Sequence, residues 1–226
     1  MPKTKLIIIG VGGHAHSVID IVESGEHHTV LGMLDTSSAR TDRKFTYQVW
    51  ASEHDIDAIL AKKASQNQSE LVVAIGNNFD RSQIHNQIKS QTPKVEFACL
   101  VHPRAHVSRR ATIGVGSVVM AGAIVNAGCK IGDGVIINSN AVVDHDCVIG
   151  DFSSVAPGAI LGGRVSIGER SSIGLGAKLI HNLNIGNDVC VGAGAVVLNN
   201  IDIDSVVAYG NPSKVIRSRQ PDESYL

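Results

Sequence analysis

The chain has 226 residues, a formal net charge of −1 and an aromatic content of 4%. This length allows two small domains with hydrophobic cores, and the weak charge and scarce aromatic residues argue against a nucleic-acid partner. No apolar stretch approaches the roughly 20 residues that span a bilayer, and the start, MPKTKLIIIG, has no signal-peptide pattern, so we expect a cytoplasmic protein without a membrane span.

Residues 1–102 alternate apolar runs with amphipathic runs. In chain order they read KLIIIG, HAHSVIDIVESG, TVLGMLD, HDIDAILAKKA, ELVVAIG, RSQIHNQIKSQ and VEFACLVH. Continuous aliphatic strands that alternate with helices predict a parallel sheet covered on both faces. We therefore expect a half-Rossmann-like α/β domain over residues 1–102.

A glycine loop follows the first expected strand, in IIIGVGGHAHSVID, and Asp35 ends the second. Gly10, Gly12 and Ala15 match the G-x-G-x-x-A pattern of dinucleotide sites, so an NAD site is one interpretation. A dinucleotide needs two mononucleotide-binding halves, and this domain provides one. Backbone N–H groups at a helix start can cradle a diphosphate, so we favour a single nucleotide.

From Val107 onward an aliphatic residue recurs at every sixth position. These positions are Val107, Ile113, Val119, Val125, Ile131, Ile137, Val143, Ile149, Val155, Leu161, Ile167, Ile173, Leu179, Ile185, Val191 and Val197. The residue two positions earlier is mostly small, and glycine often follows the aliphatic residue, where we expect it to permit turn dihedrals. The hexapeptide period predicts a parallel β-helix over residues 103–226, with three hexapeptides in each triangular coil.

The stretch VVDHDCVIGD contains a histidine between two aspartates. His145 comes two residues after the inward Val143, so its side chain should leave the prism. Stacked coils place it in one column with Ala127, Gly163 and His181. A solvated surface histidine is the simple interpretation, and the flanking carboxylates of Asp144 and Asp146 favour a functional one.

The hexapeptide array with NSNAVVDHDCVIGDFSSVAPGAILGG, the tail AYGNPSKVI and the leading IIIGVGGHAHSVID together resemble the NeuD/PglD family of left-handed β-helix sugar acetyltransferases. Its members include sialic acid O-acetyltransferases and N-acetyltransferases of nucleotide-linked amino sugars. The resemblance covers nearly the whole chain. It implies a left-handed β-helix, a homotrimer, and acetyl-CoA bound between adjacent prisms.

The resemblance makes His145 the general base and Asp146 its supporting acid. An imidazole has a pKa near neutrality, which suits it to take the proton of a sugar ammonium during direct attack on the thioester. A carboxylate beside the ring holds the tautomer and stabilises imidazolium. Whether Asp144 or Asp146 orients His145 stays open at this point.

The resemblance also implies the contacts of acetyl-CoA. Ser154 aligns with the residue that contacts the acetyl carbonyl, and the amide of Gly163 is a second donor for the oxyanion. Leu175 and Ala193 flank the pantetheine through their main chain, although plain turn residues are an equal interpretation. Pro212 and Lys214 lie near the adenine and phosphate end. We expect acetyl-CoA as cosubstrate and no metal.

A third set of residues is implied to bind the nucleotide-linked sugar. The family pattern places the diphosphate at the glycine loop and the base and ribose near Asp35 and Gly76. Arg81 is a phosphate candidate, with a solvated helix-face charge as the alternative. The full set is Gly12, Gly13, His14, Asp35, Gly76 and Arg81.

The remaining histidines and the cysteines predict no metal site. The cysteines are far apart without a C-x-x-C pair, and we expect them to be reduced and mostly buried. A zinc carbonic anhydrase shares the hexapeptide architecture, but His145 and His181 stand two coils apart, about 9.6 Å, too far to ligate one ion. The other histidines are expected in turns, on helix surfaces and at the domain junction; they include His27, His28, His54, His85, His102 and His106.

Together these features predict an acetyl-CoA-dependent N-acetyltransferase of a nucleotide-linked amino-deoxy sugar, such as a 4-amino-4,6-dideoxy sugar, in bacterial glycan biosynthesis. The alternatives are O-acetylation of a sialic acid or related sugar, and a scaffold or nucleotide-sensing trimer without catalysis. The nucleotide base, whether UDP, dTDP or GDP, the sugar stereochemistry and the acceptor atom stay open.

Overall fold

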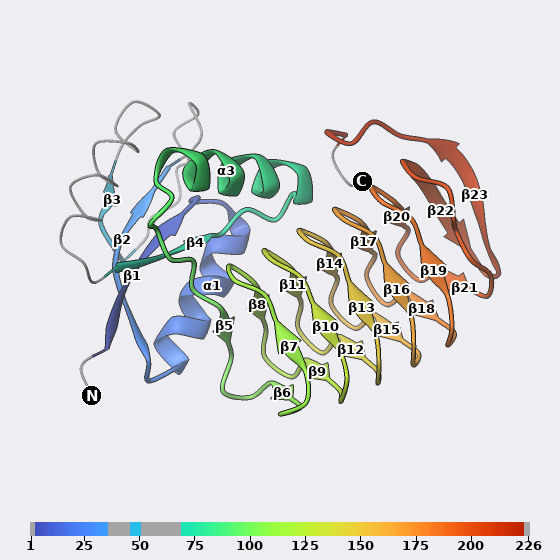
Figure 1. Cartoon of the computed structure of the whole chain (residues 1–226), viewed down its shortest axis with the longest axis horizontal. Coiled ribbons are helices and arrows are strands. Elements are labelled where there is room, and N and C mark those ends of the chain that lie inside the picture. The colour runs from blue at the N-terminus through green and yellow to red at the C-terminus, as the bar shows by residue number, and fades with distance from the viewer. Residues whose placement is uncertain (1–2, 36–45, 51–68, 224–226) are drawn as a thin grey trace.

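The structure is a computed structural model that describes residues 3–35, 46–50 and 69–223. An α/β domain at the N-terminus leads into a long solenoid whose coils stack away from it (Figure 1). The expected helix HDIDAILAKKA, with His54, lies outside the described residues. Within the described residues, no helix is long and apolar enough to cross a bilayer.

The N-terminal sheet is parallel, as expected. It contains β1 (Thr4–Ile9), β2 (His28–Leu34), β3 (Val49–Trp50) and β4 (Ser69–Val73), in the order β3-β2-β1-β4. The helices α1 (Gly13–Ser24) and α3 (Asn78–Gln91) pack on its two faces. The side chains of β1 from Leu6 to Ile9 are completely buried, because a parallel sheet between two helix layers has no solvated face.

The segment VEFACLVH crosses between the domains and does not form a full strand of the N-terminal sheet. Phe97 makes one isolated parallel bridge to Leu71 of β4. Three residues later, β5 (Leu100–Val101) pairs with β8 (Val118–Val119) of the solenoid. The solenoid therefore begins slightly before the boundary expected at residue 102.

The solenoid has three parallel faces that are built mostly from two-residue strands. The five-stranded face contains β7 (Thr112–Ile113), β10 (Lys130–Ile131), β13 (Val148–Ile149), β16 (Ser166–Ile167) and β19 (Asn184–Ile185). The six-stranded face contains β6 (His106–Val107), β9 (Ile124–Val125), β12 (Val142–Val143), β15 (Ile160–Leu161), β18 (Lys178–Leu179) and β21 (Val196–Val197).

The third face has eight strands and ends in a hairpin. It contains β5, β8, β11 (Ile136–Ile137), β14 (Ser154–Val155), β17 (Ser172–Ile173), β20 (Cys190–Val191), β22 (Val206–Gly210) and β23 (Ser213–Ser218). β22 and β23 pair antiparallel. On all three faces, partners in successive coils from β5 to β21 lie 18 residues apart, as for Lys130 with Val148, which confirms the hexapeptide prediction.

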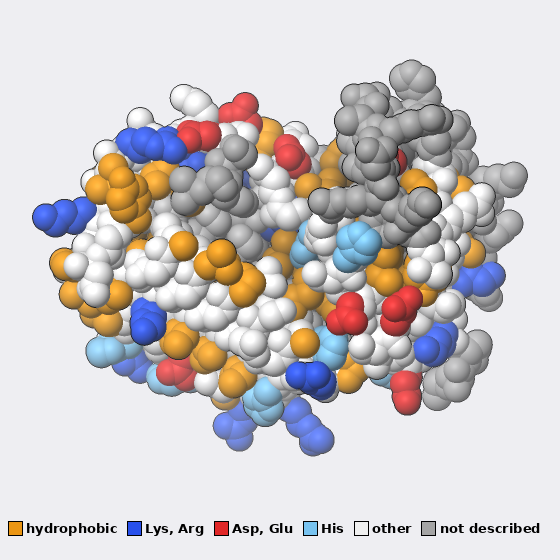
Figure 2. All heavy atoms as spheres, turned by 180° about the vertical axis from the view of Figure 1, so that it is seen from behind, with side chains coloured by type: hydrophobic (Ala, Val, Ile, Leu, Met, Phe, Trp, Pro, Cys, Tyr) orange, Lys and Arg blue, Asp and Glu red, His pale blue; other side chains and the backbone are white. Residues whose placement is uncertain are grey.

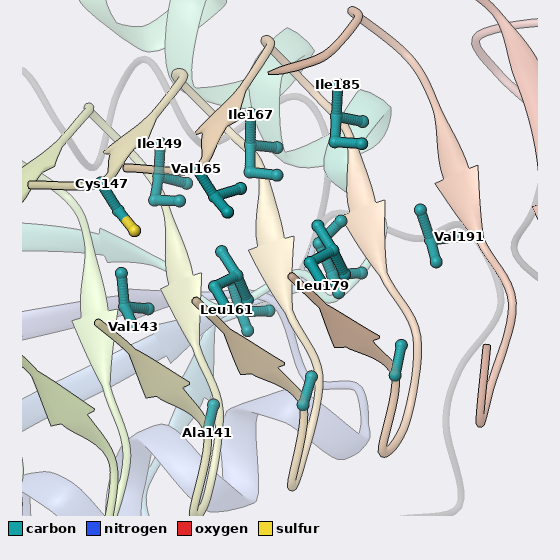
Figure 3. Close-up of a cluster of buried hydrophobic side chains, with 14 of the residues drawn as sticks. Ala141, Val143, Cys147, Ile149, Leu161, Val165, Ile167, Leu179, Ile185 and Val191 are labelled. Atoms are coloured by element: carbon teal, nitrogen blue, oxygen red, sulfur yellow. The ribbon is translucent and has the colours of Figure 1, made fainter. Parts of the chain in front are cut away.

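The core of the solenoid is the aliphatic column expected from the sequence. Every member from Val119 to Val197 is at most 4% exposed, and Val107 and Ile113 in the first coil are partly buried. Figure 3 shows these side chains pointing into the prism from all three faces. One inward aliphatic residue per face fills the interior, so the period of six follows from packing.

The glycines that follow the inward residues have a different role from the one expected. Gly150 has no left-handed backbone, and a Cβ there would lie 2.7 Å from the backbone N of Glu169 in the next coil. The left-handed positions come two residues later in each hexapeptide, as at Gly128, Gly134 and Asp146. Close approach of the next coil, and not turn dihedrals, therefore requires glycine after the inward residue.

The two domains share a buried interface. Val18 of α1 packs in one apolar cluster with Val118, Met120 and Ile136 on the outside of the eight-stranded face. This face is covered by α1 in its first coils, which is why its outward residues there are apolar.

Candidate active site

His145 lies in the turn that joins β12 to β13, on the edge between the six- and five-stranded faces. Its side chain is 47% exposed, so it leaves the prism as expected. The ring Nδ1 lies 2.8 Å from Oδ2 of Asp146. A ring that donates through Nδ1 carries its lone pair on Nε2, the arrangement a general base requires.

The two flanking aspartates have different partners. Asp146 contacts the imidazole, whereas Oδ1 of Asp144 accepts hydrogen bonds from the backbone N–H of His145 at 2.8 Å and from Nδ2 of Asn126 at 3.0 Å. These bonds, the backbone one first, hold the pKa of Asp144 below its usual value. The geometry therefore favours Asp146 as the group that orients the ring, and Asp144 fixes the backbone of the turn.

Gly163 stacks against the imidazole from the next coil. A Cβ at residue 163 would lie 2.6 Å from Cε1 of His145 and closer still to Nε2. A side chain at residue 163 would therefore displace the ring from this position, and Nε2 faces the Gly163 backbone. This places the expected second amide donor beside the expected base.

The other residues assigned to acetyl-CoA lie elsewhere on the prism. Ser154 is on β14 of the eight-stranded face, which is opposite the edge that carries His145. Leu175 and Ala193 are exposed in turns between the eight- and six-stranded faces, and Pro212 and Lys214 are exposed at the terminal hairpin. Within one chain, Ser154 and His145 therefore do not both reach the same acetyl group.

A second region, in the N-terminal domain, is a pocket of about 670 Å³. It gathers five of the six residues assigned to the nucleotide-linked sugar from the ends of β1, β2 and β4 and the start of α1. They are Gly12, Gly13, His14, Asp35 and Gly76. The carboxyl ends of parallel strands meet at one sheet edge, which is why residues so far apart in sequence converge.

The glycine loop leaves open space in this pocket. Gly12 is the N-cap of α1 and no side chain caps the helix there. A Cβ on Gly12 would meet no atom within 4 Å, whereas Gly10 has φ 109° and a Cβ there would lie 3.0 Å from the carbonyl of Ala74. The first N–H groups of α1 are thus available to an anionic ligand.

His14 presents a neutral imidazole at the pocket. Its Nε2 is buried and has no hydrogen-bond partner among the described residues. Burial first, and the charge of Arg81 second, lower the pKa of His14 to about 4. The ring is therefore uncharged at neutral pH, and a bound ligand would supply the missing partner.

The pocket also contains residues that belong to none of the sequence motifs. Asp80, Gln83 and Ile84 project from α3 into it. Their spacing of three and four residues places them on one helix face, a pattern that the sequence contained.

Arg81 and His85 differ from their sequence interpretations. Arg81 does not line the pocket and is 1% exposed, so it is neither a phosphate contact there nor a solvated helix-face charge. His85, expected on a helix surface, is buried between the rings of Phe97 and Phe152. Both corrections have one cause, because the solenoid covers the α3 face that carries these residues.

Two further observations concern the cysteines and metals. Cys129, Cys147 and Cys190 are buried as expected, and Cys99 is exposed. Within the ranges that the structure describes, no three His, Cys, Asp or Glu side chains are grouped to hold a metal ion.

The solenoid, the His–Asp pair on its edge and the nucleotide-sized pocket define a hexapeptide-repeat acyltransferase with a second, N-terminal binding domain. Residues 5–88 match the PglD N-terminal domain, and residues 128–163 match the bacterial transferase hexapeptide model of six repeats. A search of curated proteins returned no match.

Solved structures show the relationship along the whole chain. The acetyltransferase domain of PglB from Neisseria gonorrhoeae FA1090 is 36% identical with a TM-score of 0.83, covering 95% of this chain and 100% of that chain. The same domain in complex with acetyl coenzyme A is 35% identical with a TM-score of 0.82, covering 95% and 100%. PerB from Caulobacter crescentus, in complex with CoA and GDP-perosamine, is 36% identical with a TM-score of 0.83, covering 94% and 97%.

The chain belongs to the NeuD/PglD-like family of left-handed β-helix sugar acetyltransferases. It is accordingly an acetyl-CoA-dependent enzyme of the acyltransferase class.

Proposed function

We propose that the protein transfers the acetyl group of acetyl-CoA to the amino group of a nucleotide-linked amino-deoxy sugar, such as a 4-amino-4,6-dideoxy sugar, in bacterial glycan biosynthesis. The observation that carries the proposal is the contact between His145 Nδ1 and Asp146, with Nε2 over Gly163. The relative PerB, solved with CoA and GDP-perosamine, supports an activated amino sugar as acceptor.

In this mechanism the sugar nitrogen attacks the thioester carbonyl directly. Nε2 of His145 takes one proton from the sugar ammonium as the new C–N bond forms, the second proton that the nitrogen must lose passes to solvent, and the C–S bond breaks as the tetrahedral intermediate collapses. The proton on the imidazolium then neutralises the CoA thiolate. Asp146 stabilises the imidazolium through Nδ1. Because the amine attacks the thioester directly, the mechanism needs no acyl-enzyme, and it involves no metal ion.

We further propose that the enzyme is a homotrimer with acetyl-CoA between neighbouring prisms. Ser154, Leu175 and Ala193 lie away from His145 in one chain, so a neighbouring subunit must contribute them if they act together. Apolar side chains also remain uncovered on the solenoid, and Figure 2 shows such side chains on its rear surface. They include Val148, Ile160, Leu175, Ile180 and Leu198.

Within that trimer the expected contacts of acetyl-CoA keep their roles. The amide of Gly163 and the hydroxyl of Ser154 donate to the oxyanion. The backbone of Leu175 and Ala193 flanks the pantetheine, and the ammonium of Lys214, beside Pro212, attracts the phosphate end.

The pocket of the N-terminal domain binds the nucleotide diphosphate in this proposal. The uncapped amides at Gly12 and Gly13 receive the phosphates, and neutral His14 forms the hydrogen bond that its buried Nε2 lacks among the described residues. Asp35 and Gly76 line the ribose and base. A pocket of this kind favours an activated sugar over free sialic acid, the substrate of the O-acetyltransferase alternative.

The test is a panel of acceptors with acetyl-CoA, in which CoA release is followed and the product is identified by mass spectrometry. We expect an amide product from one of the UDP-, dTDP- or GDP-linked 4-amino sugars, and unchanged activity in EDTA. An ester formed on sialic acid would establish the alternative. No turnover with any acceptor would indicate a scaffold or a nucleotide sensor. We also propose that the enzyme acts in the cytoplasm.

A further inference from the structure

Three buried side chains of α3 face one edge of the solenoid. Asn78, Arg81 and His85 are at most 2% exposed and lie on one side of the helix. Their partners are Gly134, Phe152 and Arg170, which are 18 residues apart and occupy the edge between the five- and eight-stranded faces. Figure 1 shows α3 running along this edge. The helix therefore spans successive coils.

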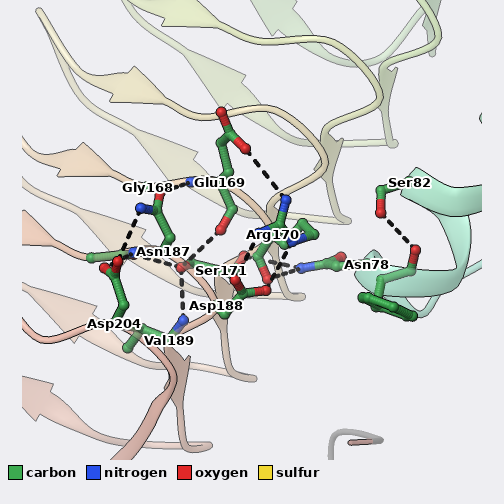
Figure 4. A network of polar contacts seen from close by, with 12 residues as sticks. Asn78, Ser82, Gly168, Glu169, Arg170, Ser171, Asn187, Asp188, Val189 and Asp204 are labelled. Carbon is green, nitrogen blue, oxygen red and sulfur yellow. Dashed lines mark hydrogen bonds and ion pairs between the residues drawn. The ribbon is translucent and has the colours of Figure 1, made fainter. Parts of the chain in front are cut away.

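Asn78 holds the first turn of the helix to the solenoid. Its Nδ2 donates to the carbonyls of Arg170 at 3.2 Å and Ser171 at 3.0 Å, as Figure 4 shows. Its Oδ1 accepts a hydrogen bond of 2.7 Å from Nη2 of Arg81. Asn78 is thus the first member of a network that Arg81 continues.

Arg81 binds both domains with one guanidinium. Nε donates to the carbonyl of Gly134 at 2.7 Å, and Nη2 donates to that of Phe152 at 2.8 Å. On the other side, Nη1 donates to the carbonyls of Ile75 at 2.9 Å and Gly76 at 3.0 Å. Ile75 and Gly76 line the nucleotide pocket.

The solenoid side of this contact belongs to the coil that carries His145. Phe152 precedes Ser154 by two residues, and His145 lies in the same coil, on the preceding edge. Only arginine has a planar fork of five N–H groups that can address both sides at once. A lysine offers three donors from one point and cannot reproduce the geometry.

We propose that Arg81 is a positioning residue that holds the pocket loop, residues 75–77, at a fixed distance from the catalytic coil. The inference rests on the proposed function, because a nucleotide bound at the loop then presents its sugar amine at His145 of the catalytic site. A displacement of about 1 Å in such an arrangement costs on the order of 10²-fold in rate.

The domains do not depend on Arg81 alone for their association. Val18, Met120 and Ile136 belong to a separate apolar cluster under α1. We therefore expect Arg81 variants to remain folded and to lose alignment of the pocket.

The experiment compares Arg81→Lys with Arg170→Lys. Arg170 is a matched control, because its guanidinium pairs with Asp188 at 2.7 Å within the solenoid and does not reach the pocket loop. For Arg81→Lys we expect kcat/KM for the nucleotide-linked amino sugar to fall by about 10²-fold, with the KM for acetyl-CoA unchanged. Turnover of the same amino sugar without its nucleotide should stay at the wild-type level, as should all constants of Arg170→Lys.

A loss that is equal for nucleotide-linked and free amino sugar would mean a purely structural role and overturn the proposal, as would wild-type kinetics. Amide hydrogen exchange provides a second readout that needs no turnover. Exchange at residues 75–77 should rise in Arg81→Lys and not in Arg170→Lys. Unchanged exchange in Arg81→Lys would overturn the proposal that Arg81 holds this loop. If wild type acetylates none of the nucleotide-linked sugars, the proposed function fails, and the exchange result still decides whether Arg81 anchors the loop.

If Arg81→Lys does not fold, Asn78→Ser takes its place. This variant removes the bonds to Arg170 and Ser171 and the Oδ1 acceptor of Arg81 Nη2, while the Arg81 contacts to Ile75 and Gly76 remain. We expect a smaller loss with the same selectivity for the nucleotide-linked substrate. A loss without that selectivity overturns the proposal.

Discussion

The imidazole of His145 lies against the backbone of Gly163, the residue directly beside it in the next coil. A Cβ at residue 163 would lie 2.6 Å from the ring Cε1, inside any real contact distance. Stacking at the coil spacing therefore places residue 163 so close to the imidazole that a side chain there would displace the ring.

Gly163→Ala should displace the imidazole and lower kcat by about 10²-fold, with little change in folding, because residue 163 is not in the left-handed region. Steady-state kinetics and thermal unfolding measure the two effects. The control is the double variant with His145→Asn. Since both changes act on one ring, it should be no slower than His145→Asn alone. Additive losses would show that Gly163 acts apart from His145.

His145→Asn should lower kcat by about 10²- to 10⁴-fold, the usual contribution of a positioned acid-base group. The side chain is half exposed and fills no core, so the melting temperature and the sedimentation coefficient should stay near the wild-type values. Near-native kcat at saturation with the true acceptor would require another base or a water chain.

Asp146→Asn and Asp144→Asn separate the roles of the two carboxylates. Asn tolerates the left-handed backbone of residue 146, where φ is 58°, so the fold should survive. We expect Asp146→Asn to lower kcat, by less than His145→Asn does, because the imidazolium loses its counter-charge. Asp144→Asn keeps an acceptor for the His145 N–H and should cost less again. The reverse order of the two kcat values would make Asp144 the orienting group.

Gly12→Val should obstruct the nucleotide pocket without strain. Gly12 has φ −79° and an added Cβ meets no protein atom within 4 Å, so the new side chain projects into open space. We expect a raised KM for the sugar substrate and an unchanged KM for acetyl-CoA. The same KM effect is expected from a β-branched residue at Gly13. Equal losses for both substrates would mean that the loop is structural.

The pH dependence of stability should report His14. Its pKa falls from 6.5 to about 4 on folding, so between these values the unfolded chain binds a proton that the folded chain does not. Stability is therefore complete above about pH 6.5 and is lost as the pH falls toward 4, at up to about 1.4 kcal/mol per pH unit. Urea unfolding between pH 4 and pH 7 measures this slope.

The control for that slope is His14→Gln. Gln has no titration in this range, so the variant should lose less stability on acidification than wild type does. Part of the slope should remain, because burial also lowers the pKa of His85. An identical slope in both proteins would assign the acid sensitivity to groups other than His14.

Local sequence determined the solenoid and predicted much of both candidate sites. A period of six repeats itself in every coil, so the inward column, the outward His145 and its contact with residue 163 all follow from counting. The glycine loop could also be predicted from local sequence, because it joins a strand to a helix within a few residues. The pocket of the N-terminal domain contains Gly12, Gly13 and His14 of that loop, together with Asp35 and Gly76 from the ends of β2 and β4.

Only the tertiary structure decided which side chains of the N-terminal domain are buried by the solenoid and where the chain passes from one sheet to the other. Arg81 and His85 look solvated on an isolated helix, and they are buried because the solenoid covers that side of α3. The segment VEFACLVH looks like one strand, yet Phe97 and Leu100 pair with different sheets. The pattern of a helix specifies which residues share a face. Whether that face is buried depends on what packs against it, and the partners of Arg81, Gly134 and Phe152, lie more than 50 residues away in the chain.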